Sequence, residues 1–259
     1  MELKKYKKLP IIKRLYPSIV KKIYNLFGKN EIYFQYFDTR FKGNINEPID
    51  KEIYLFNDYE SEQIKILIKE LNKKKYNYFL DIGANLGLYS LIVSNKFSNI
   101  KIKSFEPISN SIIKFKENIK LNPNSKNIEI FEYGLSDQNT KLLMKSYKKK
   151  NYIQLGGFGV ASKGENLNNL FTSYANFRKG DEILKIENES LVVKIDTEGH
   201  EEQVINGLKK IMIKNNVLLQ VEIFIKNYER VNNLLTNLNF RKVSFVKNLE
   251  KIDYFYKNF

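Results

Sequence analysis

The stretch FLDIGANLGLYS, residues 79–90, decides the fold of this chain. Its apolar start up to Ile82 is typical of a buried strand, and the residues from Leu86 onward are typical of a helix. Gly83 and Gly87 suit a tight turn between the two, because glycine has no side chain to obstruct the backbone. Small residues also let a ligand approach closely, and a helix offers free N–H groups at its first turn. The stretch therefore predicts a strand, a ligand-binding turn and a helix.

Strands and helices alternate on both sides of this unit. Apolar residues recur at helical spacing in residues 60–71, 86–97, 109–121, 201–213 and 228–238. Short apolar or alternating runs predict strands at 52–56, 78–82, 100–105, 128–133, 191–195, 217–221, 241–246 and 254–256. Such an order predicts an α/β fold with a largely parallel sheet.

Two carboxylates follow neighbouring strands in a pattern that suggests the ligand. Asp81 lies two residues before Gly83, where it would repel a pyrophosphate but would suit a ligand with an ammonium and a sulfonium group, such as S-adenosylmethionine. Glu106 ends the next strand, and a carboxylate there accepts hydrogen bonds from ribose hydroxyls in βαβ nucleotide sites. The two positions together predict a nucleoside-containing cofactor.

A third cluster, VKIDTEGHE at residues 193–201, contains the single histidine of the chain. It follows a buried strand, and ligands of open α/β sheets bind at the carboxyl ends of strands. His200 has the intrinsic pKa of a general base, and Asp196 or Glu198 could act instead. His200 could equally cap a helix. Asp196, Glu198 and Glu222 could offer oxygen ligands, but their spacing is not diagnostic, so no metal site is predicted.

These motifs closely resemble the FkbM family of S-adenosylmethionine-dependent methyltransferases. The resemblance covers roughly residues 78–225 and rests on FLDIGANLGLYS at 79–90, SFEP at 104–107, ENIKLN at 117–122, YGLSD at 133–137 and VKIDTEGHEEQVINGL at 193–208. It implies a Rossmann-like class I methyltransferase fold, with a seven-stranded, mostly parallel sheet and helices on both faces. It also implies O-methylation of a hydroxyl on a sugar, a glycan-type acceptor or another small molecule.

The resemblance also implies roles for individual residues. The methionine moiety of the cofactor would be lined by Asp81, Gly83, Ala84, Asn85 and Gly87. Glu106 would hold the ribose, and Ser136 and Asp137 would lie near the adenine. The reaction cleft would hold Asp196, Glu198 and His200, with no single base assigned.

The chain is basic, with 44 Lys+Arg against 29 Asp+Glu and a net charge of +15. More than half of this excess lies in residues 1–30, where Pro10 and Pro17 predict that a basic amphipathic helix is interrupted into short pieces. One interpretation is a peripheral contact with the inner face of a membrane. Another is a nucleic-acid-directed methyltransferase or an RNA-binding module. The carboxylates at 196 and 198 would repel phosphate, so we expect no nucleic acid partner.

Composition excludes other classes and divides the chain. The absence of cysteine excludes a disulfide scaffold, a thiolate zinc site and cysteine catalysis. No apolar run has the length of a membrane span or a signal peptide, so a cytoplasmic protein is expected. We predict a basic extension at residues 1–50 and a methyltransferase domain at 51–259, with an irregular insertion or lid at about 139–190. No oligomeric state is predicted.

Overall fold

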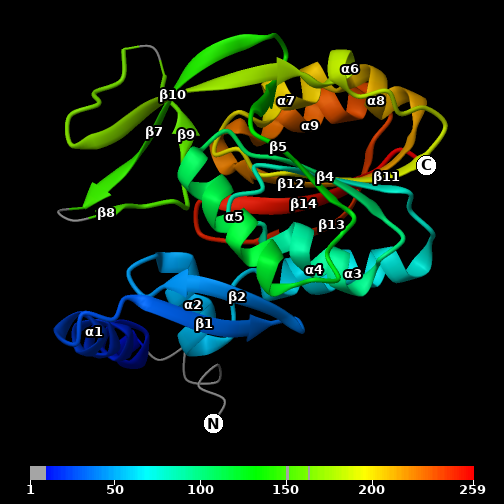
Figure 1. The fold of residues 1–259 in the computed structure, drawn as a ribbon. Helices are drawn as coiled ribbons and strands as arrows, with labels where there is room; N and C mark the ends of the chain where they lie inside the picture. Colours follow the sequence, from blue (N-terminus) through cyan, green and yellow to red (C-terminus); the bar gives the residue numbers. More distant parts are fainter. Residues whose placement is uncertain (1–9, 150–151, 163) are drawn as a thin grey trace.

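The computed structural model describes residues 10–149, 152–162 and 164–259, and its centre is a seven-stranded sheet (Figure 1). The strand order is β13-β14-β12-β11-β3-β4-β5. These strands are β3 (Tyr78–Ile82), β4 (Lys101–Phe105), β5 (Ile128–Phe131), β11 (Ser190–Ile195), β12 (Asn216–Phe224), β13 (Arg241–Lys247) and β14 (Lys251–Lys257). Only β14 runs antiparallel to its neighbours, so the predicted mostly parallel sheet is confirmed.

Helices cover both faces of this sheet (Figure 1). One face carries α3 (Ser61–Lys73), α4 (Leu88–Lys96) and α5 (Ser109–Leu121), and the other carries α7 (Glu201–Gly207), α8 (Lys209–Lys214) and α9 (Tyr228–Asn237). Successive residues of a strand point to opposite faces. Val192 accordingly joins the apolar core on one face and Val193 the core on the other. The predicted helix at 201–213 is two short helices that meet at Leu208.

The strand predicted at residues 52–56 is wrong, because these residues belong to helix α2 (Pro48–Phe56). Pro48 lies in the first turn of this helix, where the missing N–H of proline has no intrahelical partner to lose. Ile53 and Phe56 are three residues apart and both buried, so the apolar pattern is one face of a helix rather than a strand.

The N-terminal basic segment forms one helix, α1 (Pro10–Leu26), with Pro17 in its interior. The prediction of short helical pieces is therefore wrong for the described residues; residues 1–9 lie outside them. Pro17 is buried, and this packing offsets the hydrogen bond that proline cannot donate. The side chains of Leu15, Ile19 and Ile23 are exposed on this helix. Its contact with a membrane stays a prediction, and no described helix has the length and apolar character to cross one.

A hairpin joins the N-terminal segment to the main domain. Its strands are β1 (Glu31–Tyr36) and β2 (Thr39–Asn44). The backbone N–H of Arg40 donates to the side chain of Asn122, directly after α5, at 3.1 Å, and that of Lys42 donates to the side chain of Asn118 on α5 at 2.9 Å. Buried Asp50 accepts a hydrogen bond from the N–H of Asn44 and forms an ion pair with Lys114. The hairpin is thereby bound to the domain.

The predicted insertion at about 139–190 is a β-arm rather than an irregular segment. Its two long strands, β7 (Thr140–Lys149) and β10 (Leu170–Lys179), pair antiparallel and project beyond the central sheet (Figure 1). The shorter elements are β6 (Gly134–Ser136), β8 (Tyr152–Ile153), β9 (Gly159–Val160) and α6 (Gly180–Ile183). Residues 154–160 of this arm lie against the functional site described next.

Candidate active site

A cavity with about 690 Å³ of empty space lies at the carboxyl ends of β3, β4 and β11, which we call the main cavity. The strand order reverses at this point, because the chain continues from β3 to β4 on one side and later adds β11 on the other. Ligands of open α/β sheets bind at such a point. The predicted residues that line this cavity are Gly83, Asn85, Glu106, Asp196, Glu198 and His200.

Glycine is required at two positions of the turn after β3, for a different structural reason at each. Gly83 has φ +81°, and a Cβ there would lie 1.9 Å from the backbone oxygen of Asp196. Only glycine therefore allows the turn to contact the loop after β11. Gly87 has φ +83°, and a Cβ there would lie 2.1 Å from the ring of Phe115 on α5. Gly87 thus permits close packing of α4 and α5, and it does not line the main cavity.

Glu106 is held in place by the backbone. Its Oε2 accepts a hydrogen bond from the N–H of Asn85 at 2.8 Å, and its Oε1 accepts one from the N–H of Ile108 at 2.9 Å. Burial raises the pKa of Glu106 to about 7, although these two hydrogen bonds oppose the rise. A carboxylate has about four acceptor positions, so two remain available to hydroxyl groups in the main cavity.

Asp81 and Asn85 each have a buried oxygen without a partner among the described residues. Asp81 accepts hydrogen bonds from Ser90 through Oδ2, but its Oδ1 has none, and neither has the Oδ1 of Asn85. Both residues line a smaller cavity that also contains Ala84 and shares Gly83 and Asn85 with the main cavity. Buried unsatisfied oxygens destabilise a protein, so a ligand with N–H donors fits there.

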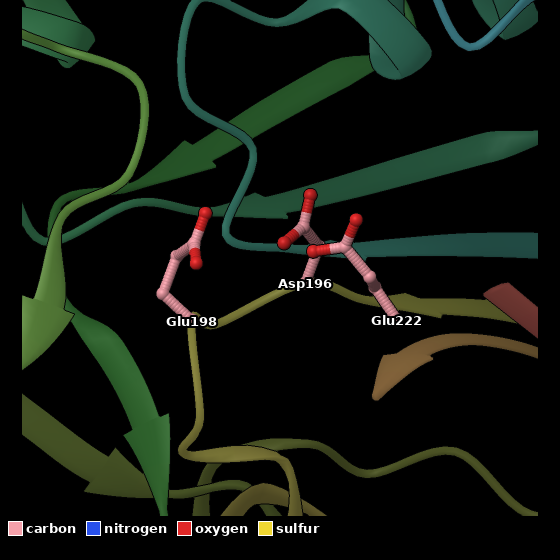
Figure 2. A group of neighbouring side chains, drawn as sticks. All are labelled: Asp196, Glu198 and Glu222. Carbon is pink, nitrogen blue, oxygen red and sulfur yellow. The ribbon is translucent and has the colours of Figure 1, made fainter. Parts of the chain in front are cut away.

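Three carboxyl groups gather beside the main cavity. One carboxyl oxygen from each of Asp196, Glu198 and Glu222 lies within 4.8 Å of the other two (Figure 2). The ammonium of Lys251 contacts Glu198 at 2.6 Å and Glu222 at 2.7 Å, and that of Lys194 contacts Asp196 at 3.2 Å. These two lysines compensate the negative charge that would otherwise make the cluster unstable.

The three carboxyl groups have different proton affinities. Burial raises the pKa of Asp196, but Lys194 and Lys251 outweigh this effect and hold that pKa below its ordinary value. Burial, and then the charge of Asp196, raise the pKa of Glu198 and bring that of Glu222 to about 10. At neutral pH Asp196 is therefore ionised and Glu222 protonated. Neighbouring groups with diverging pKa values are typical of acid–base sites.

His200 is buried, and its Nε2 lies 2.9 Å from the hydroxyl oxygen of Ser136. Its ring packs edge-on against Phe177, with the ring centroids 5.6 Å apart. Burial lowers the pKa of His200, so the imidazole is neutral at neutral pH. Ser136 is buried behind this contact and Asp137 is exposed, and neither lines the main cavity, whereas the preceding residues Gly134 and Leu135 do.

Sequence reasoning missed the two lysines of the carboxyl cluster. Lys194 had a signal, since it is the one charged residue in the apolar run of β11 and stands two positions before Asp196. A buried ammonium requires carboxylate partners, so a cluster was foreseeable there. Lys251 had none, because it belongs to β14, far along the chain, and reaches the site only through the pairing of β14 with β12.

Comparisons with known proteins give structural likenesses only. No family model matches the chain. No curated protein matches it in sequence. The precorrin-6y C5,15-methyltransferase of Geobacter metallireducens is 11% identical, with 76% of this chain and 87% of that chain covered and a TM-score of 0.45. A SAM dependent methyltransferase of Aquifex aeolicus is 10% identical, with coverages of 81% and 98% and a TM-score of 0.43.

A third solved structure, M. jannaschii TYW2 in complex with AdoMet, is 12% identical, with coverages of 88% and 86% and a TM-score of 0.42. Two of these proteins are named as methyltransferases, and the third was solved with AdoMet. Identities and scores this low do not assign an activity to this chain. Its function has to be argued from its own residues.

Proposed function

We propose that this chain is an S-adenosylmethionine-dependent methyltransferase that methylates a hydroxyl group. One observation carries the proposal. The main cavity combines Glu106, fixed by two backbone N–H groups, with the glycine turn at Gly83 and the carboxylates Asp196 and Glu198. A nucleoside-binding carboxylate and a set of acid–base groups thus lie in one cavity at the reversal point of the sheet.

The cavity walls suit the parts of this cofactor. The unpartnered oxygens of Asp81 and Asn85 would accept hydrogen bonds from its ammonium group. Glu106 would accept those of the ribose hydroxyls, and the apolar side chains of Ile108 and Leu135 would contact the adenine. The bound cofactor supplies an electrophilic methyl group.

We propose Glu198 as the group that takes the proton of the acceptor hydroxyl. Its raised pKa makes it a stronger base than an ordinary glutamate, and Lys251 fixes one of its oxygens. Asp196 is a weaker base because its pKa is lowered, and His200 is already hydrogen-bonded to Ser136. Alignment of the reacting groups supplies much of the rate enhancement, since methyl transfer requires an in-line approach.

The acceptor belongs to the same proposal. We expect a sugar, a glycan-type molecule or another small molecule, the acceptors that the sequence motifs at 79–90 and 193–208 imply. The alternative, a nucleic-acid acceptor, predicts salt-dependent binding of RNA or DNA. An electrophoretic shift assay with both polymers tests that alternative.

Calorimetric titration with S-adenosylmethionine and S-adenosylhomocysteine tests the cofactor. We expect both to bind the native chain, and Glu106→Gln to weaken binding by about tenfold to a hundredfold through loss of charge-assisted hydrogen bonds. Glu129→Gln is the matched control, since Glu129 lies on the neighbouring strand β5 and its side chain is 58% exposed. Absence of binding to either compound would end the methyltransferase proposal.

A further inference from the structure

A second large cavity, with about 850 Å³ of empty space, adjoins the main cavity, and we call it the outer cavity. The two share Gly157, Val160 and Glu198. The rest of the outer cavity is built by β7 and β9 of the arm, by the short helix η2 (Ile225–Asn227) and by the start of α9. Glu198, the proposed base, therefore stands at the border between the cofactor space and a second space of comparable size.

Cationic side chains surround the outer cavity. Lys145 comes from the arm, Lys226 from η2 and Arg230 from α9. Lys145 forms an ion pair with Glu165, and Arg230 forms one with Glu202 at 2.6 Å. Within the described ranges Lys226 forms no ion pair. The pKa of Glu165 is lowered mainly by its hydrogen bond with Lys145, and the charge of Lys226 contributes least. The lining thus has three cations and one carboxylate.

That carboxylate, Glu198, is already compensated. Lys251 binds Glu198 from outside the lining, so the positive groups are not offset by the acid that faces them. Lys226 and Arg230 are exposed at the edge of the cavity. Positive charge there attracts anions, and charge-assisted hydrogen bonds then select for them.

The remaining wall offers contact area to a hydroxylated ring. Phe224 lines the cavity, with the ammonium of Lys226 5.8 Å and that of Lys251 4.9 Å from its ring centroid. Gly157 and Gly159 line the opposite part with backbone alone. An aromatic face can hold a molecule that has both C–H and O–H surfaces.

We infer that the acceptor is a hydroxylated molecule that carries an acidic group, a carboxylate or a phosphate, which the outer cavity binds between Lys226 and Arg230 while the reacting hydroxyl lies at Glu198. This inference rests on the proposed methyltransferase function. It adds an acidic group to the class of acceptor proposed above. Lys226 and Arg230 would bind this group, and Glu198 would remove the proton of the reacting hydroxyl.

Sugars that differ only in an acidic group test the inference. The chain is saturated with S-adenosylhomocysteine and titrated by calorimetry with glucose, glucuronate and glucose 1-phosphate; we expect one or both acids to bind about tenfold more tightly than glucose. The tighter acid identifies a carboxylate or a phosphate as the preferred group. Equal binding of all three sugars, or no binding of any of them, would overturn the inference.

Variants assign the preference to the outer cavity. Lys226→Met combined with Arg230→Met should remove the preference for the acid, whereas Lys209→Met, at an exposed lysine of α8 outside both cavities, should keep it. A preference that survives in the double variant would mean nonspecific attraction to a basic protein and would contradict us. The titrations are repeated without S-adenosylhomocysteine. Failure of that compound to bind refutes the methyltransferase proposal, while the sugar series still decides whether the outer cavity prefers acids.

Discussion

The two sides of Glu198 are built in different ways. The cofactor side consists of residues at the ends of β3, β4 and β11, whose directions are fixed by the hydrogen bonds of the sheet. The proposed acceptor side consists of the β-arm, η2 and the first turn of α9, none of which belongs to the central sheet. Under the proposed function, the central sheet would position the reacting groups, while the elements around it would determine which molecule is modified.

The largest expected effect concerns Glu198, which lines both the main cavity and the outer cavity. Glu198→Gln should lower the turnover number by about a hundredfold or more, because a general base contributes that much, with cofactor affinity unchanged. Turnover of the native enzyme should fall as the pH falls through the pKa of Glu198, which lies above the ordinary 4.5. Steady-state kinetics over a pH series measures both effects.

The matched substitutions are Asp196→Asn and His200→Gln. If Glu198 is the base, the acidic limb of the pH profile should remain in both. Its disappearance only in His200→Gln would transfer the role to the imidazole, and its disappearance only in Asp196→Asn would transfer it to that carboxylate.

The second prediction concerns the join between the turn after β3 and the loop after β11. Gly83→Ala should lower the free energy of unfolding by about 3 kcal/mol, since both a left-handed backbone and an overpacked contact are forced on alanine. Gly28→Ala isolates the backbone effect, because Gly28 has φ +63° and nothing within 4 Å of an added Cβ. That control should lose only about 1 kcal/mol. Equal losses in urea denaturation would refute the close contact.

The smallest expected effect concerns the protonated member of the carboxyl cluster. Glu222 has a pKa of about 10 against an ordinary 4.5, so the folded chain binds more protons than the unfolded chain between these values. Its contribution makes stability fall as the pH rises through this window, by at most about 1.4 kcal/mol per pH unit. Glu222→Gln should therefore flatten the decline.

Denaturation at a series of pH values measures that slope. The interval above about pH 7 is the clearest, because Glu60 and Glu106 have pKa values of about 7 and contribute mainly below it. Glu129→Gln should leave the slope as it is. A slope that is the same in native and Glu222→Gln chains would show that Glu222 is ionised in the folded state.

Sequence patterns predicted which strand ends meet at the main cavity, but they did not predict the residues of the outer cavity. Asp81, Glu106 and Asp196 each follow or end an apolar run, and parallel strands bring their ends to one edge, so their meeting was foreseeable. The β-arm has no apolar pattern strong enough to distinguish long exposed strands from an irregular segment. Lys226 and Arg230 looked like ordinary surface charges, because only the positions of η2 and α9 bring them to the cavity that Glu198 also lines.

The error at α2 has a related cause. The apolar run at residues 52–56 is too short to distinguish a strand from one helical turn, and the deciding signal was Pro48 ahead of it. The prediction at Pro17 was wrong in the opposite way. The local rule that proline interrupts a helix predicted a break there, but Pro17 is buried within a continuous helix α1. Both cases show tertiary packing overriding a short-range pattern.

The hydrogen bonds between β2 and α5 bear on how the gene should be trimmed for expression. A start codon at residue 51, the apparent end of the basic extension, would remove the backbone donors of Asn118 and Asn122. It would also remove Asp50, the ion-pair partner of Lys114. These groups would then face solvent or each other, and a soluble product would be an unsuitable reagent for every titration above. A shortened gene should begin ahead of Glu31, so that the hairpin is translated with the domain it completes.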